Sequence, residues 1–177
     1  MCSCCVFKLL CFIVHWKGYV QSTYSLNVFP HSFPHARFSV VLQSPSSLSA
    51  LSITRVINCL STVEWDPLKS PPPNVKTTLH IPLDDDPSQP IIPSLLSAIH
   101  FLRSLKADQS DYCCRALVVC WAAKSRSAAI TIGCLMALMN VSFSQAFGIV
   151  AHVRPSIDLN VGFVTQLKQN EQLIRSQ

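Results

Sequence analysis

Two kinds of apolar pattern alternate along the chain from about residue 40 onward. The runs at 53–58, 75–81 and 116–119 are short and rich in β-branched or aliphatic residues, as in strands buried on both faces. Between and after these runs, apolar side chains recur every three or four residues, which is typical of helices that bury one face. Strands alternating with helices predict an α/β fold with a mostly parallel central sheet. Helices should flank both faces of this sheet, in three α/β/α layers.

Local signals mark the ends of the expected helices. Pro93 suits a first helical turn, and Ser142 with Gln145 has the Ser-x-x-Gln form of a capping box. Pro155 should stop the helix that Ser142 starts, and Asn160 can cap a last helix. The expected helices therefore cover 45–51, 93–106, a small-residue segment from 126 to about 138, 142–154, and a final stretch from 160 to about 174.

Residues 1–40 do not share this pattern. The apolar run from Cys5 to Val14 is broken by Lys8 and falls short of the roughly 20 apolar residues that a bilayer span needs. It also lacks the basic start and the cleavage site of a secretory signal. We expect residues 1–40 to be a divergent or poorly ordered N-terminal extension without stable membrane insertion, and residues 41–177 to form the folded domain.

Composition narrows the functional classes. Of the 177 residues, 49% are hydrophobic and 13% charged, which indicates a globular chain. The formal charge of +5 suits an anionic ligand, but it is spread out, so nucleic acid is not an expected partner. An odd count of nine cysteines without paired CxxC spacing argues for reduced thiols and against a metal site. We expect a cytoplasmic location, with the nucleus as a second compartment, and no cofactor.

The central segment brings a cysteine and an arginine together. The apolar run 116–119 delivers Cys120, five residues lead to Arg126, and a helical segment follows at once. A loop that closes onto a helix N-terminus directs backbone N–H groups and the positive dipole end at an oxyanion. The same field favours a thiolate, and an arginine fork matches phosphate oxygens. This arrangement suits a thiolate that attacks a phosphate ester.

These residues also resemble a known family. The segment CWAAKSRSAA, residues 120–129, is similar to the signature loop of cysteine-dependent protein tyrosine phosphatases, specifically the atypical dual-specificity protein phosphatases. The resemblance covers about three quarters of the chain, roughly 45–174. The other matching segments are 53–58, 80–87, 134–136, 144–147, 154–163 and 166–167.

The resemblance implies a phosphatase loop with assigned roles. Cys120 would be the nucleophile that takes the phosphoryl group, and Ser127 would hydrogen-bond its sulfur and help it leave. Arg126 would hold the phosphate together with the loop N–H groups. Asn160 would brace the loop, and no metal is needed. The phosphate-binding loop would comprise Trp121, Ala122, Ala123, Lys124, Ser125 and Arg126.

The general acid comes from the acidic loop 83–87. In the family it stands four residues after the isoleucine of an Ile-Pro strand end, which selects Asp85. Asp85 would protonate the leaving oxygen and later activate water. Asp84 and Asp86 stay open as alternatives.

Three features depart from the family pattern. The residue before the cysteine is usually His but here is Val119, and the third residue after it is usually Gly but here is Ala123. If that position needs positive φ, Ala costs roughly 1 kcal/mol there. The family's opening strand is not evident in residues 38–43. Either it has diverged or residues 1–40 replace it, so a sheet without this edge is one expectation.

Two functions follow, with a third set aside. The first is a protein phosphatase that hydrolyses phosphotyrosine and phosphoserine/threonine on proteins through a phosphocysteine intermediate. A phosphatase of reduced activity is included in this first function. The second is a pseudophosphatase that binds phosphoproteins or partners without turnover, which Val119 and Ala123 favour. A rhodanese-like sulfur transferase also uses a loop cysteine, but the downstream motifs do not fit it. In either main case the partner is a phosphorylated protein, and nothing in the sequence indicates the oligomeric state.

Overall fold

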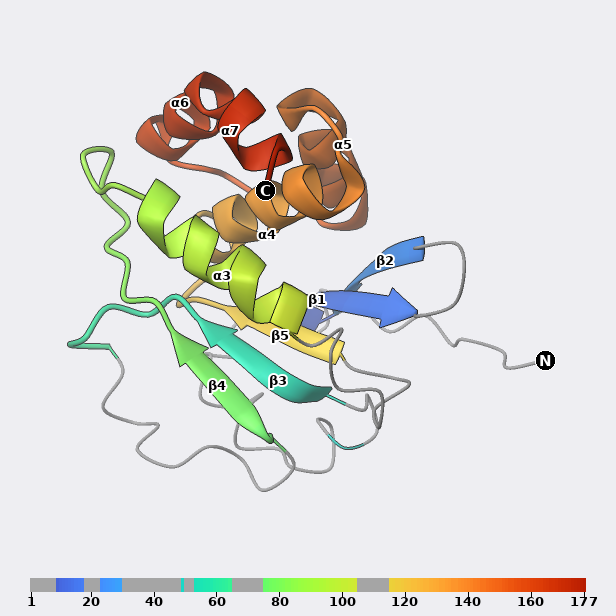
Figure 1. Ribbon diagram of the computed structural model, residues 1–177. Helices are drawn as coiled ribbons and strands as arrows, with labels where there is room; N and C mark the ends of the chain where they lie inside the picture. Colours follow the sequence, from blue (N-terminus) through green and yellow to red (C-terminus); the bar gives the residue numbers. More distant parts are fainter. Residues whose placement is uncertain (1–8, 18–22, 30–48, 50–52, 65–74, 105–114) are drawn as a thin grey trace.

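The structure is a computed structural model of the 177-residue chain, and it describes residues 9–17, 23–29, 49, 53–64, 75–104 and 115–177. These residues build one sheet of five strands, ordered β2-β1-β5-β3-β4, with a layer of helices on it (Figure 1). The strands are β1 (Leu9–Lys17), β2 (Thr23–Phe29), β3 (Ile53–Asn58), β4 (Thr77–His80) and β5 (Arg115–Val119).

The three strands β5, β3 and β4 run parallel and form the centre of the molecule. Asn58 at the end of β3 pairs with Val119 of β5 and with His80 of β4, so all three strands end at the same edge. The strand β3 has the bounds expected from the sequence, while β4 is shorter than the run 75–81 by a few residues. The expectation of an α/β fold around parallel strands is confirmed.

The other edge of the sheet comes from the N-terminal part of the chain. Strand β1 pairs antiparallel with β5, His15 lying opposite Arg115, and β2 pairs antiparallel with β1. Both strands lie within residues 1–40. Their pairing corresponds to the alternative in which residues 1–40 supply the edge that the family's opening strand would form. Residues 38–43 lie outside the described part of the chain.

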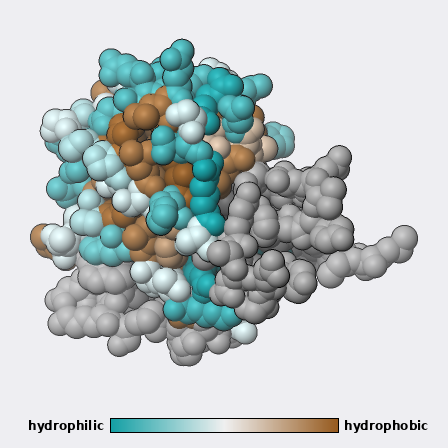
Figure 2. Space-filling view, viewed as in Figure 1, coloured by the Kyte–Doolittle hydropathy of each residue, from teal (hydrophilic) through white to brown (hydrophobic). Residues whose placement is uncertain are grey.

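Five described helices lie on one face of the sheet in Figure 1. The helix expected at 45–51 lies outside the described residues apart from Ser49. On the side shown in Figure 2, apolar side chains gather over α3 and α4 between hydrophilic ones. The helices are α3 (Ile92–Ser104), α4 (Arg126–Met139), α5 (Phe143–Val153), α6 (Val161–Gln169) and α7 (Glu171–Arg175).

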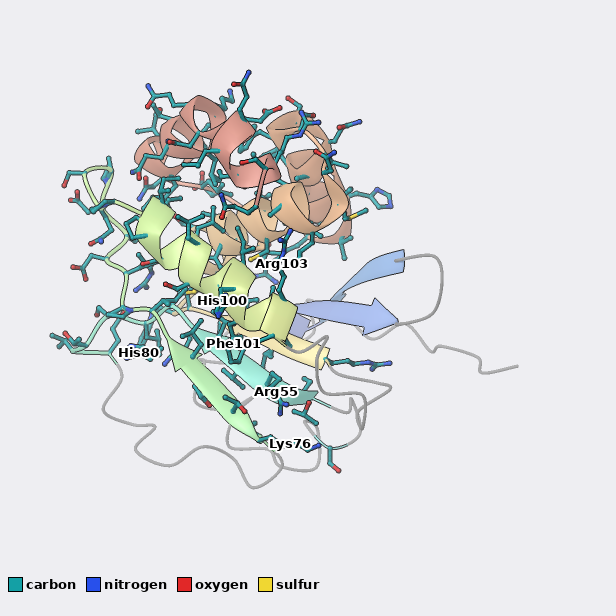
Figure 3. All side chains as sticks on the ribbon, viewed as in Figure 1. Arg55, Lys76, His80, His100, Phe101 and Arg103 are labelled. Carbon is teal, nitrogen blue, oxygen red and sulfur yellow. The ribbon has the colours of Figure 1, made fainter. Side chains whose placement is uncertain are left out.

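Helix α4 is the buried centre of the helical layer. All residues from Arg126 to Ala137 are buried. Most side chains of this helix are small or apolar on every side of it, which is typical of a helix in a protein core. Gly133 brings α3 close, since a Cβ at this position would overlap the side chain of Leu95. At the far end of α3, Arg103 Nη2 donates to the Ala137 carbonyl at 3.5 Å (Figure 3). None of the described helices is both long and apolar enough to cross a membrane.

The later helices begin where the sequence predicts. Ser142 and Gln145 form both hydrogen bonds of the capping box at α5, and Asn160 Oδ1 accepts the Phe163 N–H at α6. The last helix differs from the prediction, because it breaks at Asn170 into α6 and α7. The Asn170 side chain donates to the Gln166 carbonyl at 2.9 Å, a local bond that competes with continued helix.

Candidate active site

Cys120 lies immediately after β5, at the edge where the parallel strands end. Its side chain is buried, and its Sγ lies 3.1 Å from the Ser127 Oγ in the first turn of α4. Ligands of parallel α/β sheets bind beyond this edge of the strands. The structure therefore brings together the sulfur and the hydroxyl that the resemblance pairs.

The loop between β5 and α4 is held by its carbonyl groups. The Ala123 carbonyl accepts from Arg154 Nε at 2.9 Å, and the Lys124 carbonyl accepts from the Asp158 N–H at 3.1 Å. None of the hydrogen bonds within the described residues uses the N–H groups of residues 121–125 as donors. These donors are left for an anion at the centre of the loop.

Ser125 leaves the N-terminus of α4 uncapped. It stands at the N-cap position, yet its side chain makes no capping bond to the helix. Instead its Oγ donates to Asp85 Oδ1 at 2.6 Å. A helix N-terminus without a side-chain cap keeps its N–H groups and positive dipole end available to an anion.

Ala123 has the backbone conformation that its place in the loop requires. Its φ is 51°, in the left-handed region that normally favours glycine. This position therefore has the positive φ at which an alanine carries strain. The other departure, Val119, is fully buried, and its carbonyl accepts the Cys59 N–H at 2.8 Å.

Arg126 is buried and held by an acidic residue that sequence reasoning missed. Its Nη1 donates to Glu64 Oε2 at 2.5 Å and its Nη2 to Glu64 Oε1 at 3.2 Å. Nη1 also donates to the Leu83 carbonyl at 3.0 Å. Glu64 follows β3 within a proline-rich stretch that predicts only a loop, so no sequence signal pointed to it.

These contacts occupy one edge of the Arg126 guanidinium and leave its other edge available to a ligand. A guanidinium has an end-on edge, made by Nη1 and Nη2, and a side-on edge, made by Nε and Nη2. Glu64 takes the end-on edge. The Nε of Arg126 is buried and has no hydrogen-bond partner among the described residues. The side-on edge is thus a pair of parallel donors matched to two oxygens of a phosphate.

The ion pair shifts both partners' pKa values. The hydrogen bond from Arg126 is the largest cause that lowers the pKa of Glu64 below its ordinary value. Burial works against the charge of Arg126, but the hydrogen bonds it donates to Glu64, with Cys120 and Asp85 nearby, raise its pKa above the ordinary value. The arginine therefore keeps its charge in a buried position.

The acidic loop contacts the phosphate loop through Asp85. Besides the bond from Ser125, Asp85 Oδ1 accepts from Asn160 Nδ2 at 3.0 Å, and the Asn160 N–H donates to Ser125 Oγ at 3.2 Å. Asp86 instead accepts from the N–H of Ser88 at 2.7 Å within its own turn. Of the three candidate acids, Asp85 is the one that the structure joins to the loop, and Asn160 braces it as expected.

Helix α6 supports the acidic loop from behind. Gln166 Oε1 accepts the Ile91 N–H at 2.9 Å, and Gln166 Nε2 donates to the Gln89 carbonyl at 2.8 Å. A Cβ at Gly162 would overlap the Pro87 carbonyl, so glycine is required for this approach. The part of the chain that follows Asp85 is therefore fixed on α6.

Other side chains border the site. Trp121, the residue after Cys120, is 52% exposed. His80, at the end of β4, contacts the Leu60 carbonyl through Nε2 at 2.9 Å, just before the turn that carries Glu64 (Figure 3). Within the described ranges, no three His, Cys, Asp or Glu side chains gather as a metal ion would need.

Comparison with known proteins agrees with this geometry. Residues 38–173 match the family model described as "Dual specificity phosphatase, catalytic domain". The chain is 32% identical over 130 residues to a probable dual specificity protein phosphatase of Dictyostelium discoideum. That match covers 73% of this chain but only 30% of the relative, so the chain spans less than a third of that relative's length.

Two solved structures have a similar fold. A mouse putative dual specificity phosphatase complexed with zinc tungstate has a TM-score of 0.66 and 26% identity, covering 78% of this chain and 81% of that one. The human tyrosine phosphatase-like serine/threonine/tyrosine-interacting protein has a TM-score of 0.65 and 27% identity, covering 82% and 89%. The chain belongs to the family of dual specificity phosphatase catalytic domains.

Proposed function

We propose that this chain is a protein phosphatase that hydrolyses phosphotyrosine and phosphoserine/threonine through a phosphocysteine intermediate. The observation that carries the proposal is the unused side-on edge of Arg126, whose Nε is buried without a partner. Burying such a donor is costly unless a ligand completes it. The uncapped N-terminus of α4 and the free loop N–H groups supply the remaining donors around the same point.

In the first step, the Cys120 thiolate attacks the phosphorus as the P–O bond to the leaving oxygen breaks. Asp85 gives its proton to that oxygen. Both hydrogen bonds to Asp85 go to Oδ1, which leaves Oδ2 to carry the proton. Arg126 and the loop N–H groups stabilise the charge on the equatorial oxygens, which is where catalysis of phosphoryl transfer mainly acts.

In the second step, water attacks the phosphocysteine and the S–P bond breaks. Asp85, now ionised, takes a proton from the water. Ser127 lies 3.1 Å from the sulfur, so its hydroxyl can donate to the departing Cys120 thiolate. Inorganic phosphate leaves, and both residues return to their starting protonation states.

A second candidate is a pseudophosphatase that binds phosphoproteins without turnover. Strain at Ala123 and the absence of histidine at Val119 favour it, because both features lie in the loop that must hold the transition state. The structural similarity to the human protein named tyrosine phosphatase-like serine/threonine/tyrosine-interacting protein also supports this second candidate. In this case Cys120 and Arg126 would hold a phosphate that is not released as product.

Turnover of p-nitrophenyl phosphate separates the two candidates. The phosphatase proposal predicts turnover that vanadate inhibits and that Cys120→Ser abolishes, with retained tungstate binding in that variant. Tungstate binding by the wild type without any turnover would support the pseudophosphatase. Turnover that persists in Cys120→Ser would overturn the proposed mechanism.

A further inference from the structure

The large hydrophobic side chains that the described residues expose are not spread evenly over the chain. They are Val63, Trp121, Val161 and Leu173, with exposed fractions between 46% and 87%. Single exposed apolar residues are normal on a protein surface and need no functional explanation. Three of these four, however, belong to segments that meet at the candidate active site, whereas Leu173 lies on α7.

Two of the three are neighbours of residues that build the site. Val63 precedes Glu64, whose Oε2 lies 2.5 Å from Nη1 of Arg126. Trp121 follows Cys120 within the phosphate loop itself. Consecutive Cα atoms are about 3.8 Å apart, so each of these exposed side chains begins one residue away from a group of the site.

The third is the first residue of α6. Val161 follows Asn160, whose Nδ2 donates to Asp85 Oδ1 at 3.0 Å and whose N–H donates to Ser125 Oγ at 3.2 Å. The turn after β3, the loop between β5 and α4, and the start of α6 therefore each contribute one exposed apolar side chain. We call these three residues the apolar set: Val63, Trp121 and Val161.

The charged residues on the same segments set a second condition on what can bind there. Asp84 and Asp86 are exposed on either side of Asp85 in the acidic loop, which contacts the phosphate loop. Lys124 is the exposed cation of the phosphate loop, one charge beside two carboxylates. Because like charges repel, acidic side chains or an anionic lipid surface would meet these carboxylates. These segments therefore fit a partner that is apolar and carries no negative charge besides its phosphate.

We propose that the apolar set selects phosphoprotein segments in which apolar residues flank the phosphorylated residue. The inference rests on the proposed function of the loop as a phosphate site. An extended peptide advances about 3.3 Å per residue, so the immediate neighbours of the phosphorylated residue reach side chains one residue away from the loop. Trp121 is the main anchor, because tryptophan buries a large area and is enriched among the residues that dominate binding.

Three phosphotyrosine peptides of equal length test the proposal on the full chain. The positions on both sides of the phosphotyrosine hold leucine in the first peptide, serine in the second and aspartate in the third. Partial burial of the leucine side chains should make kcat/KM about tenfold higher for the leucine peptide than for the serine peptide. The aspartate peptide should have the lowest value. The difference should appear in KM, because these contacts are the same in the ground state and the transition state.

Substitutions in the apolar set separate its contribution from that of the loop. The double variant Val63→Ser, Val161→Ser and the single variant Trp121→Ser should each reduce the leucine-over-serine ratio to about twofold or less. The ratio within each variant is the readout, because a change at Trp121 also touches the loop. Leu173→Ser is the matched control, since Leu173 is exposed and apolar but lies on α7, and it should keep the wild-type ratio. The double variant should hydrolyse p-nitrophenyl phosphate, which has no flanking residues, at the wild-type rate.

Peptide binding to Cys120→Ser distinguishes a failure of this inference from a failure of the proposed function. Titration calorimetry of that variant gives the affinities of the same three peptides without turnover. A leucine preference in binding, with no turnover in the wild type, would support the apolar set and reject only the proposed enzyme. Turnover with equal kcat/KM for all three peptides would reject the apolar set and keep the enzyme. A preference for the aspartate peptide, or a leucine preference that the apolar-set variants retain, would also overturn the inference.

Sedimentation with vesicles of phosphatidylcholine and phosphatidylserine tests a lipid surface as the alternative occupant. We expect the wild type to stay in the supernatant, because Asp84 and Asp86 oppose an anionic surface. Sedimentation that Trp121→Ser abolishes, together with equal rates for the three peptides, would assign the apolar set to a membrane and overturn the proposal.

Discussion

Glu64 holds Arg126 end-on, with Oε2 2.5 Å from Nη1 and Oε1 3.2 Å from Nη2. The contact orients the side-on edge of the guanidinium, so in the proposed phosphatase we expect Glu64 to act as a positioning residue for the phosphate. Glu64→Gln should lower kcat/KM by about tenfold, which is roughly 1.4 kcal/mol of transition-state stabilisation. Steady-state kinetics with p-nitrophenyl phosphate measures this change. Glu171→Gln is the matched control, because Glu171 pairs with Arg175 on α7 and should leave the rate unchanged.

The same ion pair predicts a pH dependence of stability. Arg126 lowers the pKa of Glu64 in the folded chain, so the stabilisation is present above the ordinary carboxyl value of about 4.3 and is lost as pH falls through the lowered value. The melting temperature of the wild type should exceed that of Glu64→Gln at pH 7. The difference should shrink as pH falls through the acid range. A melting-temperature difference that stays constant with pH would contradict the stabilisation of ionised Glu64 by Arg126.

Replacing the strained alanine of the loop should stabilise the chain. Ala123 has a φ of 51°, where glycine has no steric penalty, so Ala123→Gly should add about 1 kcal/mol to the free energy of unfolding. Urea unfolding measures it. Ala122→Gly is the control in the same loop and should lose stability, because only Ala123 and Asn140 have positive φ among the described non-glycine residues. Combined with Val119→His, Ala123→Gly should also raise turnover several-fold.

The loss of kcat caused by substitutions in the acidic loop should depend on the leaving group of the substrate. Asp85→Asn removes the proposed proton donor, whose carboxylate accepts hydrogen bonds from Ser125 and Asn160, so kcat should fall by about 100-fold with phosphotyrosine. The fall should be smaller with p-nitrophenyl phosphate, whose leaving oxygen needs less protonation. Asp86→Asn should have little effect, since Asp86 bonds within its own turn to Ser88. Equal losses in the two variants would count against Asp85 as the acid.

Gly133 of α4 and Gly148 of α5 should respond in opposite ways to replacement by alanine. Gly133→Ala forces a Cβ against Leu95 and should cost about 1–3 kcal/mol of stability. Gly148 lies in α5 with nothing within 4 Å of a new Cβ, so Gly148→Ala should gain about 0.5–1 kcal/mol from helix propensity. Thermal unfolding of the two variants compares them directly. A loss of stability in Gly148→Ala would contradict the open surroundings of Gly148, and no loss in Gly133→Ala would contradict the close approach of α3 to α4.

Patterns within a few neighbouring residues correctly predicted those parts of the fold that depend on contacts between near neighbours in the chain. The capping residues Ser142 and Asn160 could be read because each bonds within three positions of itself. The signature loop carried Cys120, Arg126 and Ser127 in a fixed spacing, so their proximity followed from the strand–loop–helix order. The spacing rule that selected Asp85 agrees with its contact to Ser125.

Most features that the sequence did not predict depend on contacts between distant segments of the chain. Glu64 meets Arg126 across 62 positions, and nothing local in a proline-rich stretch distinguishes it from a solvated carboxylate. The strand pairing of β1 with β5 joins residues about a hundred positions apart. The break at Asn170 is local, but a single side chain decides it within an otherwise helical pattern.

The contacts among Asp85, Ser125 and Asn160 have a consequence for how a substrate would be engaged. They close the acidic loop onto the phosphate loop through hydrogen bonds within the chain itself. The conformational entropy of that closure is lost during folding and not during binding. A phosphate group would therefore enter a preorganised site, and its rate of association should not be limited by a closing movement of the acid.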